Sequence, residues 1–160
     1  MKKVLFSIIA LITLAACDGG LEPYKTEELS YIRGRIYYKN GREGWPPKDS
    51  VIEVRVVAFK NFASDSIYKD IISGNAIYTN SSTAMFVDSA DFEIEVKEAP
   101  LTFNYIVVAQ RYGSLFDWRA IGVYTVTGDV YKPSKLDVEK GKSYFITMNV
   151  DFNNLPPQPF

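Results

Sequence analysis

Short stretches of alternating apolar and polar residues recur along this chain, separated by glycine, proline and asparagine. Successive side chains of a β-strand point to opposite faces, so alternation with period two predicts a half-buried strand. The pattern is plainest at residues 31–38 and 51–59. Further strands are predicted at 76–78, 92–96, 103–111, 118–126, 135–138 and 143–152. About seven short strands with turn residues between them predict an all-β fold, a single antiparallel β-sandwich over residues 31–152.

Two segments of the chain depart from this pattern. Residues 64–72 predict the one short helix, with Ser64 or Ser66 as N-cap and Gly74 just after its end. Residues 153–160 hold three prolines, which lack the N–H that a β-ladder requires. We therefore expect residues 153–160 to form an extended tail on the surface.

The amino terminus has the three parts of a secretory signal. A short basic start precedes an apolar run from Val4 to Leu14, which is about half the roughly 20 residues needed to span a bilayer. Small residues then follow at Ala15 and Ala16. Such a segment is removed from the mature protein, so residues 1–16 are predicted to be a cleaved signal helix outside the fold.

The sequence Leu14-Ala15-Ala16-Cys17 resembles the lipobox of bacterial lipoproteins. The resemblance implies cleavage before Cys17, a diacylglycerol on its thiol and an acyl chain on its new amino group. Two or more chains anchor a protein stably to a membrane. Residues 17–30 would then be a lipidated tether, and the protein would sit on the inner or outer membrane of the cell envelope. The alternative is an ordinary secretory signal cleaved near a cysteine.

Composition excludes several classes of function. The chain has no histidine and one cysteine, so Ser-His-Asp triads, Cys-His dyads, internal disulfides and zinc sites of the usual kind are excluded. The net charge is −1, and it becomes −3 once Lys2 and Lys3 leave with the signal. Nucleic-acid binding would need a basic stripe, which is absent. We expect no catalytic residue, no cofactor and no metal.

Three residues of the predicted sandwich are candidate ligand contacts. Trp45 lies in a proline-bounded loop, where it could stack on a sugar or a partner, or fold over the open end of the sandwich. Arg33 and Arg35 lie on the polar face of the first strand. They could bind an acidic glycan or a phosphate, or form a solvated face balanced by Glu53 across the sheet.

Carboxylates at two places suggest other chemistry. Glu93 and Glu95 point to the same face of one predicted strand, and glycoside hydrolysis uses a pair of carboxylates. The alternative without function is that Glu93 and Glu95 are simply polar residues on the solvent-exposed face of a strand. Asp88 and Asp91 could supply oxygen ligands to Ca²⁺, but the spaced ligands and glycine of a calcium loop are missing.

The predicted first two strands also carry a family resemblance. Ile32-Arg33-Gly34-Arg35-Ile36 followed by the strand at 51–59 resembles the start of transthyretin-like and carboxypeptidase-regulatory-like sandwiches, and residues 136–150 resemble their last two strands. An immunoglobulin-like sandwich is the alternative topology. Residues 62–91 depart from the pattern, because they are longer than the usual hairpin. The resemblance implies an accessory or binding module without catalytic residues.

These observations give three hypotheses of function. The first is a membrane-anchored envelope lipoprotein whose β-sandwich binds a protein or glycan partner, with membrane lipid attached through Cys17. The second is a structural or assembly subunit of a surface appendage or outer-membrane complex. The third is a carboxylate-dependent hydrolase using Glu93, Glu95 or the loop aspartates.

Overall fold

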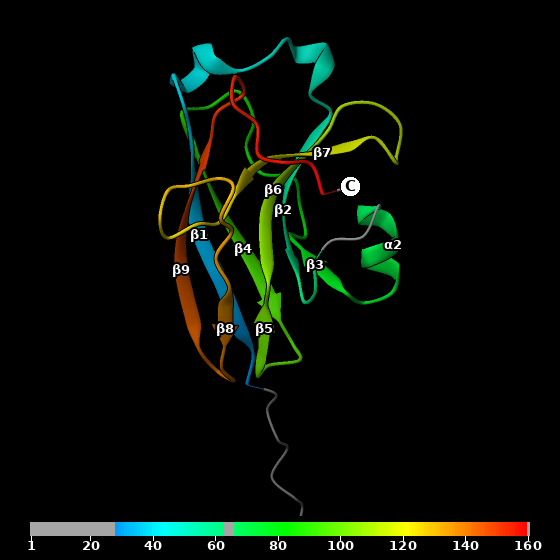
Figure 1. The fold of residues 1–160 in the computed structure, drawn as a ribbon, viewed down its shortest axis with the longest axis vertical. Coiled ribbons are helices and arrows are strands. Elements are labelled where there is room, and N and C mark those ends of the chain that lie inside the picture. The colour runs from blue at the N-terminus through cyan, green and yellow to red at the C-terminus, as the bar shows by residue number, and fades with distance from the viewer. Residues whose placement is uncertain (1–27, 63–65, 160) are drawn as a thin grey trace, which may run out of the picture.

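The structure, a computed structural model, describes residues 28–62 and 66–159. Within these residues it holds nine strands, one α-helix and two short 3-10 turns (Figure 1). In chain order the elements are β1 (Ser30–Tyr38), η1 (Gly41–Gly44), η2 (Lys48–Ser50), β2 (Glu53–Phe59), α2 (Ile67–Ile72), β3 (Ala76–Tyr78), β4 (Ser89–Val96), β5 (Leu101–Phe103), β6 (Tyr105–Arg111), β7 (Trp118–Val123), β8 (Leu136–Val138) and β9 (Ser143–Val150). The all-β prediction is confirmed, with nine strands instead of about seven. The predicted signal peptide, Cys17, Ser64 and most of the tether lie outside the described residues.

Seven strands form one sheet in the order β3-β2-β6-β7-β9-β1-β4, and β5 pairs with β8 separately. The prediction of a purely antiparallel arrangement is wrong at one pair, because β1 and β9 run parallel, with Tyr31 opposite Ser143. No hairpin joins the first and last strands, so no turn forces them to be antiparallel. The other neighbours in the sheet are antiparallel.

The seven-stranded sheet folds over itself at the junction of β7 and β9. These strands pair at Gly122 opposite Val150 and at Val123 opposite Asn149. A Cβ atom on Gly122 would lie 2.7 Å from the carbonyl oxygen of Asn149, so a glycine permits this close approach. Figure 1 shows β1 and β9 on one side of the molecule and β2 and β6 on the other. The inward side chains enclose a core that includes Ile32, Ile36, Val54, Val56, Ile94, Ile106, Val108 and Met148.

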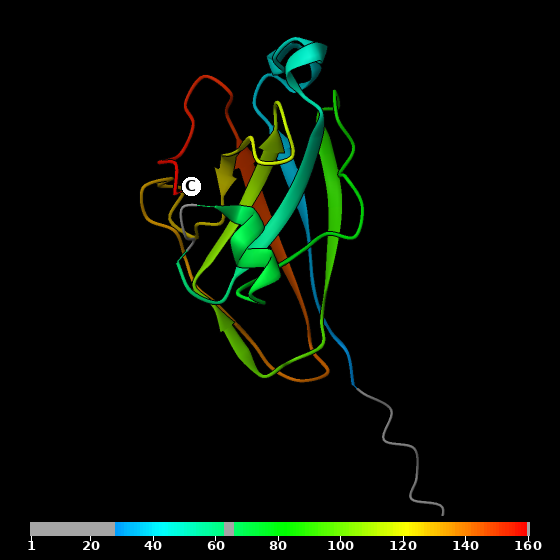
Figure 2. The same ribbon diagram turned by 90° about the vertical axis from the view of Figure 1, so that its right-hand side faces the viewer.

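A second apolar cluster lies on the outer face of β2 and β6. Figure 2 shows α2 in front of these strands. Ile67 of the helix is buried there against Val57, Phe59 and Val107. The first six residues of β6 are all buried, as predicted for a central strand, because both of its faces are covered. The helix prediction is confirmed: Ser66 precedes α2 with an extended backbone and Gly74 follows it at φ +73°.

Side-chain hydrogen bonds between segments far apart in the chain explain where the structure differs from the predicted strands and how the tail is held. The predicted strand 103–111 is divided at Asn104, whose side-chain amide donates to the carbonyl of Lys60 at 2.5 Å. Phe103, before this break, belongs to β5, which pairs with β8 and not with the main sheet. The proline-rich tail lies on β7 as an extended segment, and the amide of Gln158 bonds both main-chain groups of Ala120, at 2.9 and 3.0 Å. The tail therefore protects a sheet edge with a side chain, where its prolines could not pair.

Candidate functional site

Arg33 and Arg35 project from the outer face of β1 toward the neighbouring strand β4. Arg33 donates from Nε to Glu93 at 2.5 Å, and Arg35 binds Asp91 through two bonds of 2.6 and 3.1 Å. The bond to Arg35 lowers the pKa of the Asp91 carboxyl, and the same contact raises the pKa of the Arg35 guanidinium. The two arginines thus form a ladder of exposed ion pairs along the sheet.

The expectation that Glu53 balances Arg33 and Arg35 is wrong. Glu53 lies on β2, in the half of the folded sheet that β3, β2, β6 and β7 form. There it accepts hydrogen bonds from Arg55 and Arg111. The register of the sheet decides this, since β1 pairs with β4 and β9 and not with β2. Sequence alternation shows which residues share a strand face but not which strands are neighbours.

Trp45 lies across one end of the sandwich, apart from the two arginines. Its ring centre is 4.3 Å from that of Tyr38 and 5.0 Å from those of Phe86 and Phe152. The indole N–H donates to the carbonyl of Val87 at 2.9 Å. The side chain is half-buried and closes the end of the core. Its position is therefore that of a tryptophan folded over the open end of the sandwich, the second interpretation given above. A ligand contact at Trp45 stays a prediction.

The carboxylates considered for hydrolysis or calcium are occupied by protein groups. Glu93 and Glu95 share one face of β4 as predicted, but Glu93 binds Arg33, and Glu95 lies 3.5 Å from Lys97. Asp88 accepts a hydrogen bond from the main-chain N–H of Arg42. Within residues 28–62 and 66–159, no group of three or more acidic, cysteine or histidine side chains gathers at metal-binding distance.

A different site emerges where the two ends of the sheet approach each other. β4 is the last strand at one end, and its even-numbered residues bond to β1, as Tyr38 N–H to Asp88 C=O shows at 3.0 Å. Antiparallel pairs alternate, and each residue directs its N–H and C=O to the same side. Asp91, Glu93 and Glu95 therefore direct their main-chain groups away from β1, along an open edge.

The opposite end of the sheet presents a second open edge. β3 bonds to β2 through odd-numbered positions, since Lys60 N–H reaches Asn75 C=O at 2.8 Å and Thr79 N–H reaches Val56 C=O at 3.0 Å. Ala76 and Tyr78 consequently direct their main-chain groups to the open side. Beyond β3, the Ser82 hydroxyl both accepts from and donates to the main chain of Val54. The open edge of β3 is thus limited to a few residues.

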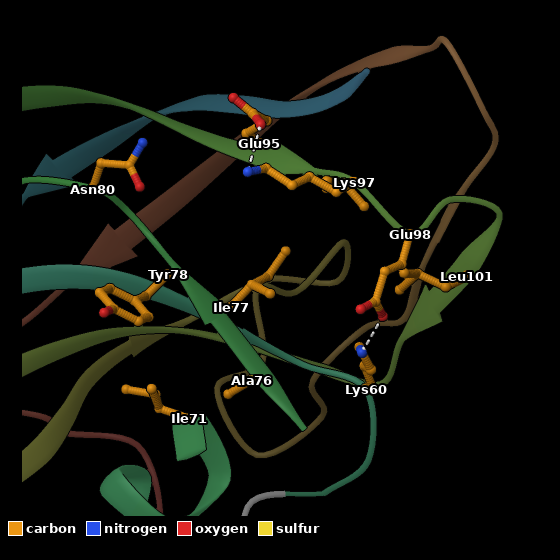
Figure 3. Close-up of a pocket in the computed structure, with 11 residues that line it drawn as sticks. Lys60, Ile71, Ala76, Ile77, Tyr78, Asn80, Glu95, Lys97, Glu98 and Leu101 are labelled. Atoms are coloured by element: carbon orange, nitrogen blue, oxygen red, sulfur yellow. Dashed lines mark hydrogen bonds and ion pairs between the residues drawn. The ribbon is translucent and has the colours of Figure 1, made fainter. Parts of the chain in front are cut away.

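A groove of about 380 Å³ lies between these two edges, and we call it the seam groove (Figure 3). Apolar side chains supply much of its wall, and two ion pairs border it: Lys60 with Glu98 at 2.6 Å, and Lys97 with Glu95. The bond from Lys60 lowers the pKa of the Glu98 carboxyl. The groove is lined by Lys60, Ile71, Ala76, Ile77, Tyr78, Asn80, Glu95, Val96, Lys97, Glu98 and Leu101.

No local sequence pattern predicts the seam groove. Its two edges are 11 residues or more apart in the chain, from Tyr78 to Ser89, and the strand at 76–78 is only three residues long. The one signal was the interval 62–91, which departs from the family pattern in length. That interval holds α2, β3 and the loop to β4, and it builds one side of the groove.

Comparison of the chain with protein-family models, with curated proteins and with solved structures finds no match. In the part of the chain that the structure describes, no helix has the length and apolar character needed to cross a membrane.

Proposed function

We propose that this chain is a lipid-anchored protein of the bacterial envelope whose β-sandwich binds, without chemistry, an extended segment of a partner protein in the seam groove. The observation that supports it best is the pair of open strand edges, on β3 and β4, that border one groove with apolar walls. An open edge pairs readily with an added strand.

Strand addition uses two kinds of contact. Main-chain hydrogen bonds to the open edge give affinity, and pockets for alternate side chains give specificity. Here Glu95 on β4 and Tyr78 on β3 offer main-chain groups, while Ile77 and Leu101 offer apolar surface for one or two side chains. We expect the bound segment to be extended and to carry an apolar residue, flanked by polar residues that meet the two ion pairs.

The fold begins close to the seam groove. β1 begins at Ser30, which was predicted to be the last residue of the tether, and Ser30 is opposite Val96, which lines the groove. A diacylated and N-acylated Cys17 would supply membrane affinity of roughly 0.8 kcal/mol per buried methylene. The partner segment would then be bound near the membrane surface, within the reach of the tether.

The open edges also favour the second hypothesis, a subunit of a surface or outer-membrane assembly. In that case the added strand would belong to a permanent neighbour, and the pairing would survive purification as a complex of fixed stoichiometry. A transient partner would dissociate on dilution. Sedimentation of the protein extracted from its own membranes distinguishes the two, because only an assembly subunit would sediment with a constant partner.

A peptide-binding experiment tests the seam groove. Full-length protein in detergent micelles is titrated with a library of seven-residue peptides, and affinities are measured for wild type, Glu95→Pro and Glu95→Ala. Proline removes the outward N–H while leaving the bonds of β4 to β1 in place. We expect Glu95→Pro to lose binding and Glu95→Ala to keep it. Asn80→Trp, which fills the groove from the exposed side, should also abolish binding.

Two results would contradict the proposal. One is a set of peptides that bind equally to wild type, Glu95→Pro and Asn80→Trp, since such peptides would not use the groove. The other is the absence of any saturable binding in the library. Circular dichroism of each variant ensures that lost binding is not lost folding.

A further inference from the structure

The outer face of the sheet carries a second arrangement of polar and aromatic residues. Glu53 on β2, Arg111 on β6 and Trp118 on β7 stand directly opposite one another in a row across three strands. Arg111 donates from Nε to Glu53 at 3.1 Å, and Arg55 donates to the other oxygen of the same carboxylate. Side chains opposite each other on neighbouring strands are in contact range, so register alone brings this row together.

These charges do not balance. Two guanidinium groups flank one carboxylate, and the three side chains are only 17–25% exposed. Arg55 is fixed further by its bond to the carbonyl of Thr79 and by its position 5.3 Å from the ring centre of Tyr78. Among the described residues, Arg111 makes its side-chain hydrogen bond through Nε, which leaves its terminal nitrogens for another acceptor. The row therefore presents an excess positive charge in a partly desolvated setting.

A groove of about 210 Å³ adjoins this row, and we call it the outer groove. Glu53 and Arg55 form its polar end, and Val57 forms part of its floor. Its size is below the 300 Å³ or more typical of sites for drug-sized ligands, so it suits a single ring. Its other walls come from α2, β3 and the loop before β7, and they are Ile67, Tyr68, Ile71, Tyr78, Leu115 and Trp118.

The aromatic walls combine apolar surface with polar edges. Tyr68 and Tyr78 are each about 40% exposed and carry hydroxyl groups, while the Trp118 N–H is bonded to the carbonyl of Leu115 at 2.9 Å. That bond fixes the indole plane. Aromatic rings of this kind provide a rigid flat surface with hydrogen-bonding groups at the rim. A pyranose ring has the complementary form, with an apolar C–H face and hydroxyl groups around its edge.

We propose that the outer groove binds a carboxylate-bearing sugar, a uronic acid residue of a glycan. The sugar ring packs on Trp118, and its hydroxyl groups meet the tyrosines and Glu53. Its carboxylate binds Arg111, which does not itself line the groove but stands in the row between Glu53 and Trp118, two residues that do. Guanidinium and carboxylate form strong, geometrically specific hydrogen bonds because both are charged and planar. The carboxylate also neutralises the excess charge of the row.

This inference goes beyond peptide binding at the seam groove and does not depend on it. Ile71 and Tyr78 border both grooves, so the two sites are neighbours on either side of β3. The residues that carry the two proposals differ, since Glu95 belongs to the seam groove and Trp118 to the outer groove. Variants at these positions therefore separate the sites.

The test is a titration of full-length protein in detergent micelles with a trisaccharide of galacturonic acid and, separately, with a trisaccharide of neutral galactose. Calorimetry measures affinity for wild type, Trp118→Ala, Arg111→Gln and Arg33→Gln. Arg33→Gln is the matched control. Arg33 also forms a cross-strand ion pair with a glutamate, but on β1 and β4, away from the outer groove. Arg111→Lys retains the positive charge and Trp118→Phe retains an aromatic ring. These two conservative variants show whether a loss of binding comes from the missing group or from a loss of folding.

We expect the acidic trisaccharide to bind saturably and about tenfold or more tighter than the neutral one, as one lost charge-assisted hydrogen bond implies. Trp118→Ala and Arg111→Gln should each weaken this binding by about tenfold, with Trp118→Phe less affected and Arg33→Gln unchanged. Equal affinity for the two sugars, or wild-type binding by Arg111→Gln, would overturn the proposal. So would tighter binding of a polyglutamate peptide than of the acidic sugar, since the groove would then be a peptide site.

Discussion

The ring of Phe92 lies over Gly34, its partner across β1 and β4. A Cβ atom at position 34 would stand 2.8 Å from two ring carbons of Phe92 and 2.1 Å from the main-chain oxygen of Ile146 on β9. Both strands that flank β1 thus occupy the space of the missing side chain. This contact gives a physical reason for the glycine at the centre of the first strand.

Gly34→Ala is expected to lower the free energy of unfolding by about 1–3 kcal/mol, the usual cost of excess atoms in a well-packed region. Urea denaturation followed by circular dichroism measures the change. Arg35→Ala, at the next residue on the exposed face, is the control and should cost clearly less, as expected for an exposed ion pair. Equal effects of the two substitutions would show that Gly34 is not constrained as described.

Glu53→Gln is expected to destabilise the protein more than Glu93→Gln does. Glu53 is 17% exposed and accepts from two arginines, whereas Glu93 is 52% exposed and pairs with one. Hydrogen bonds to a charged group contribute about 1.5–3 kcal/mol when buried, against about 0–1 kcal/mol for an exposed pair. Thermal and urea unfolding at pH 7 compare the two variants. A larger loss for Glu93→Gln would contradict the burial of the Glu53 row.

Trp45→Ala is expected to remove roughly 3 kcal/mol of stability, the lower part of the range for truncating a large aromatic side chain. The half-buried indole contacts three aromatic rings, so its loss opens the end of the core. Phe116→Ala serves as the comparison, because Phe116 is 66% exposed and its loss should cost less than about 0.5 kcal/mol. Similar losses for both variants in urea unfolding would mean that Trp45 does not close the core.

Stability is expected to fall as the pH rises above about 10. Burial raises the pKa of the Tyr38 phenol to about 12, and burial does the same for Tyr105. Unfolded tyrosine ionises near pH 10, so between about pH 10 and 12 the folded state retains protons that the unfolded state has lost. Folding stability therefore decreases through this window and is unaffected by these groups below it.

Tyr38→Phe is the variant that tests this alkaline effect. The buried Tyr38 hydroxyl makes no hydrogen bond of normal geometry among the described residues, and its interaction with Thr83 lowers the pKa less than burial raises it. Its removal should therefore leave stability at pH 7 unchanged or slightly higher. The loss between pH 10 and 12 should become smaller. An unchanged slope in Tyr38→Phe would count against the raised pKa.

The strands and the helix could be read from the sequence, because alternation and capping are local properties. Residues 31–38 and 76–78 were predicted within a residue of β1 and β3, and Gly74 marked the end of α2. The break at Asn104 could not be read, since it depends on a hydrogen bond to Lys60, 44 residues away. Strand direction was equally hidden for β1 and β9, which no turn connects.

The sites were harder to predict than the strands, because neighbouring strands determine them. Arg33 and Arg35 were correctly placed on one exposed face, but their partners on β4 were not foreseen. The row of Glu53, Arg111 and Trp118 spans 65 residues of chain and exists only through the register of three strands. The proposed role of Cys17, by contrast, depends on a short motif of neighbouring residues in the chain.

Lipid attachment is tested most directly by intact-protein and peptide mass spectrometry of the full-length chain, extracted from the membranes of a producing bacterium. We expect the first residue to be Cys17, carrying a diacylglycerol thioether and an N-linked acyl chain, with residues 1–16 absent. Cys17→Ser should carry no lipid and should not remain with the membrane fraction. An intact Met1, or an unmodified Cys17 in the wild-type protein, would contradict the proposed anchor.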